Sequence, residues 1–241
     1  SRIKKDLGPS PGRAPVLAYL ESERHARLLE LRVRYRGADE PRDPWGGDER
    51  LGRIGREALG KGFAAVAGCT RSGLPARFLE EHVFEFPGAA GIDTVDGASL
   101  TVAGALALAS LWLEKSLPVD LVESACPGPD ATSLARAGEI GPKVQALAAC
   151  TRGAPCRLLL HPDNLSDAGT APGLRVRPIE TWADVLREAG LGKKLGQATF
   201  LPGPVAVLDL VRDLQEAVGC VRQQNLAAYK SVGPVPWLVL G

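Results

Sequence analysis

The chain has 241 residues, of which 45% are hydrophobic and 24% are charged, and its formal net charge is +1. This is the composition of an ordinary globular protein, and the length suffices for one substantial domain. The near-neutral charge and an aromatic content of only 5% argue against a nucleic-acid-binding protein. A membrane protein is also not expected, because no segment has the roughly 20 successive apolar residues of a bilayer span.

The five cysteines form neither a zinc-binding nor a disulfide pattern. We therefore expect no metal site and a reducing, cytoplasmic location. The three histidines, His25, His82 and His161, are scattered and are interpreted as structural. No methionine is present, including at position 1, so we expect a processed chain or a part of a longer protein.

The N-terminal part predicts an arm followed by a hairpin. Residues 1–15 combine charges with Pro and Gly and predict a flexible arm. Residues 16–37 predict two strands, and Arg32, Arg34 and Arg36 fall on one face of the second strand. We interpret these arginines as a solvated face of the sheet, with a docking surface as the alternative.

A helix is predicted next, over residues 49–67, with its apolar residues on one side. Within it, GREALGKG (55–62) approaches a phosphate-binding loop. The motif lacks the Ser or Thr that would hold magnesium, and no buried strand precedes it. We therefore predict no nucleotide site in this segment.

A long apolar stretch follows a turn formed by Asp96, Gly97 and Ala98. From Leu100 to Leu113 no residue is charged, which predicts a buried helix over 99–114. Ser99 stands at its start, beside free backbone N–H groups and the positive end of the helix dipole, a place that can stabilise an oxyanion. The alternative is that Ser99 merely caps the helix.

A second helix, predicted over 143–150, is introduced by Gly141-Pro142-Lys143, since proline suits a first helical turn. The helix dipole disfavours the charged form of a lysine there, and burial would lower its pKa further. Lys143 is therefore a candidate general base, with a solvated surface lysine as the alternative.

The remaining elements are assigned by pattern. We predict a hairpin over 121–138, a short buried strand over 157–162, a further strand over 174–179, and a helix over 181–190 with a Thr cap and a Gly stop. Residues 191–241 predict a helical extension and a terminal apolar strand. That strand ends on glycine, as strands leading into phosphate-binding loops do, although it can equally complete the sheet.

In order and spacing, residues 16–190 resemble the proteolytic domain of the Lon protease family. The family pattern is an Asp-Gly-Pro-Ser turn, a buried helix, a hairpin and a Gly-containing turn before a helix that carries a lysine. Here Ser99 and Lys143 are 44 residues apart, close to the family interval. HVFEFPG (82–88) resembles the strand before the serine, and RLLLHPDN (157–164) resembles the strand after the lysine.

The resemblance implies an α+β fold of the Lon proteolytic type, similar to ribosomal-protein domain 2, with mixed sheets covered by helices. It implies Ser99 as nucleophile and Lys143 as base. Ala98, Leu100 and Asp96 would support the turn and the oxyanion. The family threonine that hydrogen-bonds the lysine reads Ala125 here, so the candidates for dyad support are Ser124, Thr132, Ser133 and Glu85.

The function so implied is a serine endopeptidase that cleaves a partner protein selectively, without a metal or cofactor. ATP would enter only through an adjoining ATPase or STAND-type domain or subunit, linked through residues 191–241. The first alternative is an inactive interaction or assembly module, as a homo-oligomer or ring. The second is an unrelated small-molecule enzyme on the same architecture.

Overall fold

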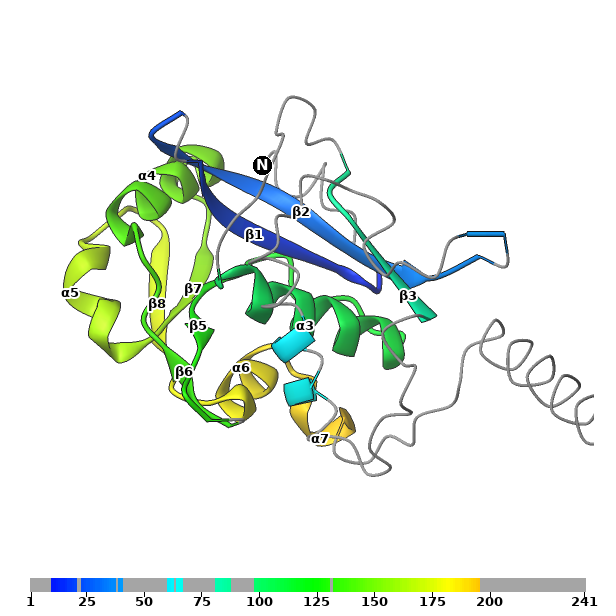
Figure 1. Cartoon of the computed structure of the whole chain (residues 1–241). Helices are drawn as coiled ribbons and strands as arrows, with labels where there is room; N and C mark the ends of the chain where they lie inside the picture. Colours follow the sequence, from blue (N-terminus) through cyan, green and yellow to red (C-terminus); the bar gives the residue numbers. More distant parts are fainter. Residues whose placement is uncertain are drawn as a thin grey trace, which may run out of the picture. The chain divides into compact units, whose positions relative to one another are not determined.

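The computed structural model describes residues 10–20, 23–37, 39–40, 60–62, 64–66, 81–87, 98–130 and 132–195. These residues belong to one compact unit, Ser1–Leu201. The predictions for residues 1–9, for most of 49–67 and for 196–241 lie outside the described residues. The fold is α+β, with antiparallel and parallel sheets packed against helices (Figure 1).

The antiparallel sheet consists of β1 (Arg13–Leu20), β2 (His25–Tyr35) and β3 (His82–Glu85), in the order β1-β2-β3. β1 and β2 form the predicted hairpin, although β1 begins at Arg13 rather than at residue 16. Its side chains point to the two faces in turn, and Leu17 is buried in the core that contains Val144 and Leu147. Ala14, Val16 and Ala18 are buried in the core that contains α3.

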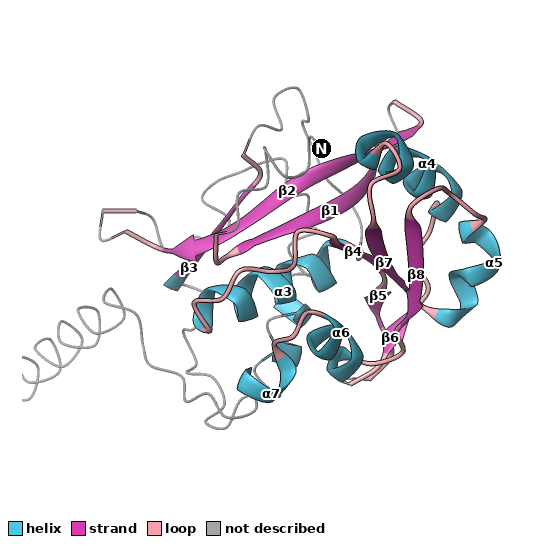
Figure 2. Ribbon diagram, turned by 180° about the vertical axis from the view of Figure 1, so that it is seen from behind, coloured by secondary structure: helices cyan, strands magenta, loops and turns pink. Residues whose placement is uncertain are grey.

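The parallel sheet consists of β4 (Leu121–Ser124), β7 (Cys156–Leu160) and β8 (Leu174–Pro178), in the order β4-β7-β8 (Figure 2). The strands predicted over 157–162 and 174–179 are thereby confirmed.

The hairpin predicted over 121–138 is only partly right. β5 (Cys126–Pro127) and β6 (Leu134–Ala135) pair antiparallel, but β4 pairs with β7 in a parallel sheet. All four residues of β4 are buried, which suits a parallel strand covered on both faces.

Helices cover these sheets. Thr181 accepts a hydrogen bond from the Asp184 N–H, and the Asp184 carboxylate accepts one in return, so the predicted Thr cap is confirmed as a capping box. Residues 60–62 and 64–66 are helical, within the helix predicted over 49–67. The labelled helices are α3 (Leu100–Trp112), α4 (Ile140–Thr151), η2 (Pro162–Asn164), α5 (Leu165–Ala168), α6 (Trp182–Glu188) and α7 (Gly192–Leu195).

Helix α3 is buried from Leu100 to Ser110, as its uniformly apolar sequence predicts. A helical segment approaches it closely at Gly62, where an added Cβ would lie 2.5 Å from the Thr101 carbonyl oxygen. Only glycine allows this approach. Among the described residues, no helix is both long enough and apolar enough to cross a bilayer.

Two hydrophobic cores lie on opposite faces of β4. Leu121 and Ala125 belong to the core around α3, whereas Val122 belongs to the core that includes Val144 and Leu147 of α4. Successive side chains of a strand point to opposite faces, so residues of β4 enter the two cores in turn. This strand therefore connects the serine-bearing and lysine-bearing helices.

Candidate functional site

Lys143 lies in the interior, in the first turn of α4. The helix begins at Ile140, so Pro142 occupies the first turn as predicted. The lysine is only 4% exposed, and its Nζ donates a hydrogen bond to the Ser124 Oγ at 3.2 Å. Burial lowers the pKa of Lys143, although the charge of Glu123 opposes this. Lys143 is thus a buried amine whose neutral form is favoured, and its interpretation as a solvated surface lysine is wrong.

Ser124 supplies the contact with this lysine. It ends β4, is 1% exposed, and lies on the same side of the strand as Val122, toward α4. Of the four side chains considered for dyad support, Ser124 is the one that the structure joins to Lys143. The sequence predicted a hydroxyl near this position but did not distinguish which one points inward.

The other three support candidates have partners elsewhere. The hydroxyls of Thr132 and Ser133 both donate to the Asp130 carboxylate, at 2.7 and 2.8 Å. Their place in the β5–β6 connection explains this, because an aspartate in a turn accepts from the residues that follow it. Glu85 accepts from the Arg34 guanidinium at 2.8 Å, and no hydrogen bond joins it to Lys143.

Ser99 directly precedes α3, but it does not cap the helix. Its backbone is already helical (φ −65°, ψ −19°), and its side chain makes no capping hydrogen bond. A capping serine has an extended backbone, from which its oxygen reaches back to the first turn. The capping interpretation is therefore wrong, and the half-buried hydroxyl is not used by the helix.

The structure does not join the two predicted catalytic side chains directly. Ser99 and Lys143 are both described, and no hydrogen bond between them is present. Of the residues predicted to support the turn, Ala98 is half-buried and accepts a hydrogen bond from the Thr101 N–H, and Leu100 is buried. Asp96 lies outside the described residues.

Glu123 is a site residue that sequence reasoning missed. It is 3% exposed, and its carboxylate accepts a hydrogen bond from the Ala125 N–H at 3.1 Å and lies near the backbone of Ala103 in α3. Burial raises the pKa of Glu123 to about 8, against the effect of these N–H groups and of Lys143. The available signal was a lone acid within an apolar strand, LVES, where charge is normally avoided.

Glu123, Ser124 and Lys143 form what we call the buried cluster. Glu123 connects β4 to the first turns of α3, and Ser124 connects β4 to α4. Chemically, this arrangement provides the Lys143 amine, with its lowered pKa, beside β4. The same strand packs against α3, the helix that Ser99 precedes.

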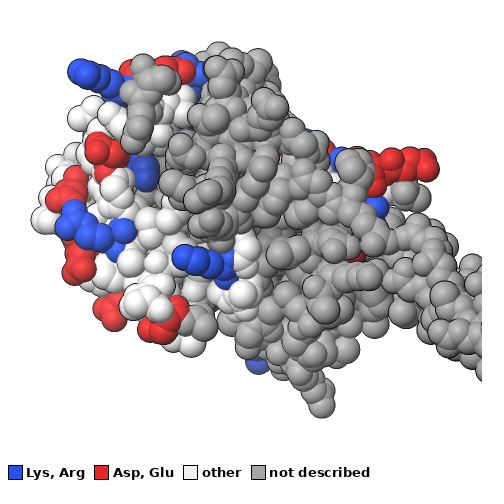
Figure 3. Space-filling model, viewed as in Figure 1, with Lys and Arg blue, Asp and Glu red and all other residues white. Residues whose placement is uncertain are grey.

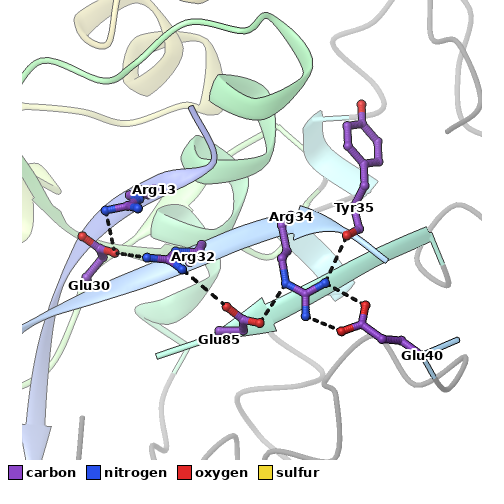
Figure 4. A network of polar contacts seen from close by, with 7 residues as sticks. All are labelled: Arg13, Glu30, Arg32, Arg34, Tyr35, Glu40 and Glu85. Carbon is purple, nitrogen blue, oxygen red and sulfur yellow. Dashed lines mark hydrogen bonds and ion pairs between the residues drawn. The ribbon is translucent and has the colours of Figure 1, made fainter. Parts of the chain in front are cut away.

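The arginine-bearing face of β2 differs from the prediction. Arg34 donates to Glu85 and Glu40, and Arg32 lies 3.9 Å from Glu85 (Figure 4). Arg36 is only 5% exposed and donates to the Glu40 carbonyl, so it is not solvated. We call the paired residues the arginine–glutamate network; its members are Arg13, Glu30, Arg32, Arg34, Glu40 and Glu85.

Within the described residues, the charges outside the buried cluster and the arginine–glutamate network do not gather in one place (Figure 3). Figure 3 shows acidic and basic side chains interspersed over the described part of one face. Within the described residues, no group of three His, Cys, Asp or Glu side chains can hold a metal ion. His82 accepts a hydrogen bond from the Trp112 indole at 3.3 Å, and His161 accepts one from the Asp163 N–H.

Neither a scan against protein-family models nor a search of curated proteins finds a match for this chain.

Proposed function

We propose that the chain is a Lon-like serine endopeptidase in which Lys143 activates Ser99. The observation that carries this proposal is the buried Lys143 amine, 4% exposed and hydrogen-bonded to Ser124. A buried lysine of lowered pKa supplies the neutral amine that a Ser-Lys peptidase needs at neutral pH. A merely structural lysine would be expected to reach solvent or a carboxylate.

The nucleophile is assigned to Ser99 rather than to Ser124 for two reasons. Ser99 is half-buried and its hydroxyl is not used by α3, whereas Ser124 is 1% exposed and cannot receive a peptide carbonyl. Ser99 also stands at the positive end of a helix of 13 residues that has no acid in its first turn. An oxyanion formed there would be stabilised by backbone N–H groups around Ala98 and Leu100.

In the proposed reaction the Ser99 Oγ attacks the peptide carbonyl carbon while its proton passes to the Lys143 Nζ. The tetrahedral intermediate then collapses to an acyl-enzyme as the C–N bond breaks, and the lysine returns the proton to the leaving amine. Water releases the acyl group with Lys143 again as base. Ser124, through its 3.2 Å contact, would hold the amine in place.

The substrate proposed is a partner protein, cleaved selectively. No step of the proposed reaction uses a nucleotide. Any control by ATP would therefore come from an ATPase or STAND-type domain or subunit, which is part of the same proposal.

The test is peptide cleavage and active-site acylation by the full chain. Wild type and the variants Ser99→Ala, Lys143→Met and Thr132→Ala would be incubated with a peptide library and with a serine-acylating phosphonate. We expect a covalent adduct on Ser99, a loss of cleavage of at least about 10³-fold in the first two variants, and wild-type behaviour in Thr132→Ala. An adduct on Ser124 would reassign the nucleophile. The same absence of cleavage and adduct in wild type and variants would overturn the enzyme proposal.

A second candidate is a non-catalytic interaction or assembly module. The observation in its favour is that no hydrogen bond joins Ser99 to Lys143, two residues that the structure describes. In this case light scattering should find a stable assembly whose size is the same in wild type and in Ser99→Ala.

A further inference from the structure

The Asn164 side chain holds both backbone polar groups of one residue near the start of α4. Its Oδ1 accepts from the Ala137 N–H at 2.8 Å, and its Nδ2 donates to the Ala137 carbonyl at 2.9 Å. Ala137 lies between β6, which ends at Ala135, and α4, which begins at Ile140. Asn164 is 0% and Ala137 1% exposed, so water cannot replace these hydrogen bonds without opening the core. We call the two hydrogen bonds the Asn164 clamp.

The segment held by the Asn164 clamp enters α4 through an unfavourable backbone conformation. Glu139, directly before the helix, is left-handed (φ 57°, ψ 39°), and its side chain makes no capping hydrogen bond. A residue with a Cβ adopts this conformation only where its surroundings hold it there. The Glu139 carbonyl accepts the Lys143 N–H at 3.2 Å, so the same residue anchors the turn that carries the lysine. The start of α4 therefore depends on contacts from outside the helix.

The end of β7 connects this helix start to the partner of the lysine. Ser124, whose Oγ accepts from the Lys143 Nζ, is paired with Leu160 of β7. From Leu160 the chain continues through His161 into η2, which ends at Asn164. The Asn164 N–H donates to the His161 carbonyl at 2.9 Å, which holds η2 against the end of the strand. One strand end thus positions both the hydroxyl and the start of the lysine-bearing helix.

We propose that Asn164 is a positioning residue for Lys143: its two hydrogen bonds to Ala137 fix where α4 begins relative to β7 and thereby hold the Lys143 amine at the Ser124 hydroxyl. Asparagine suits this role because its amide offers an acceptor and a donor side by side, matching one residue's N–H and carbonyl. As a statement about catalysis, this inference rests on the proposed endopeptidase function.

The test compares full-chain wild type with Asn164→Ala and Asn164→Asp. The alanine variant removes both hydrogen bonds of the Asn164 clamp. The aspartate variant keeps the shape of the side chain, but an ionised carboxylate can only accept from the Ala137 N–H and cannot donate to the carbonyl. The test therefore does not depend on the folding of Asn164→Ala.

Two matched controls separate positioning from a general loss of stability. Ser110 is likewise 0% exposed, and its hydroxyl accepts from the Gly12 N–H at 3.1 Å and donates to the Lys115 carbonyl at 2.7 Å. Ser110→Ala thus removes two buried hydrogen bonds of the same kind at the other end of α3. Asp167→Asn removes the charge of an exposed ion pair with Arg136, 3.6 Å apart, between the same two segments that the Asn164 clamp joins.

The decisive readout is the titration of Lys143, followed by side-chain NMR and by competitive acetylation. Burial lowers the pKa of this amine, so an amine released to solvent titrates at a higher pH. We expect the midpoint to rise by at least about one pH unit in both Asn164 variants and to stay within about 0.2 in both controls. An unmoved midpoint in the Asn164 variants, or an equal rise in Ser110→Ala, would overturn the inference.

Activity separates this inference from the proposed function. If cleavage exists, kcat should fall at least about 10-fold in Asn164→Ala while KM changes less than about twofold, because the residue acts on the base rather than on the substrate. Cleavage at the wild-type kcat in this variant would reject the role of Asn164 and leave the endopeptidase intact. A raised Lys143 titration without cleavage in any of the proteins would reject the endopeptidase and leave the positioning of the amine.

Discussion

Acidic and basic side chains occur in two regions of this molecule, and their pKa values shift in opposite directions there. In the arginine–glutamate network, Arg34 holds the pKa of Glu40 down to about 2, and the hydrogen bond to Glu40 raises the pKa of Arg34. In the buried cluster, burial instead raises the pKa of Glu123 and lowers that of Lys143.

Solvent access accounts for this difference. Arg34 and Glu40 are each 36% exposed, so water and bidentate hydrogen bonds stabilise both charges. Glu123 and Lys143 are nearly enclosed, and desolvation is the largest influence on each. The comparison teaches that a solvated pair favours the charged forms of both groups, whereas enclosure favours the neutral forms of both. Only the second arrangement suits proton transfer at neutral pH.

The strongest way to break this comparison is to place a second acid in the enclosed region. Lys143→Glu would bury a second carboxyl without a base, and we expect the free energy of unfolding at neutral pH to fall by about 3–5 kcal/mol. Urea denaturation measures this change. Lys143→Met is the control and should cost much less, because it adds no charge. Wild-type stability in Lys143→Glu would mean that this side chain is not enclosed.

Stability as a function of pH should reveal the enclosed acid. The pKa of Glu123 lies near 8 in the folded protein, above its ordinary value of 4.5. Between these values the folded protein retains a proton that the unfolded chain has released, so stability falls as pH rises through this window, by on the order of 5 kcal/mol. Lys143, with its lowered pKa, acts in the opposite sense at higher pH, up to its ordinary value of 10.5.

Unfolding free energies measured across this pH range in wild type and Glu123→Gln isolate the contribution of the acid. Their difference should grow steadily from about pH 4.5 to about pH 8. Parallel curves would contradict an enclosed, protonated Glu123.

Removing the Ser124 hydroxyl, which accepts a hydrogen bond from Lys143, should lower stability by a smaller amount. Ser124→Ala leaves the Lys143 amine without its 3.2 Å partner, and we expect a loss of about 1–2 kcal/mol in thermal or urea unfolding. Thr132→Ala is the matched control, since its hydroxyl bonds an exposed aspartate, and it should stay within about 0.5 kcal/mol. Equal losses in the two variants would place Ser124 in a solvated setting.

The smallest loss of stability is expected in the arginine–glutamate network. Glu40→Gln should cost about 0.5–1 kcal/mol at neutral pH, after allowance for solvent screening. The pKa of Glu40 lies at about 2 in the folded protein and ordinarily at 4.5. Its contribution is therefore complete above the higher value and is lost as pH falls toward the lower one. The cost of Glu40→Gln, measured by unfolding in low salt, should shrink in about 1 M salt; a salt-independent cost would mean that Glu40 is enclosed.

Local pattern was sufficient for the elements whose signals lie within a few residues. The apolar run after Ser99 predicted α3, Pro142 predicted the first turn of α4, and Thr181 predicted the cap of α6. Each signal acts through the helix itself, by burial, a fixed φ or a capping hydrogen bond.

Contacts between distant segments were not predictable in the same way. A short segment such as LVES is compatible with a hairpin strand or a parallel strand, and its partner β7 lies more than thirty residues further on. The inward direction of Ser124 and the enclosure of Glu123 follow from that pairing. The backbone of Ser99 likewise depends on how α3 meets its neighbours, so its failure to cap could not be read from the residue type.

The alternating side-chain directions in β4 limit which changes of sequence this strand can accept. Glu123 reaches α3 on one side and Ser124 reaches α4 on the other, so inserting or deleting one residue in β4 would exchange their directions. Both helices would then meet the wrong side chain at once. Leu121–Ser124 should therefore accept changes of residue type far more readily than any change in length.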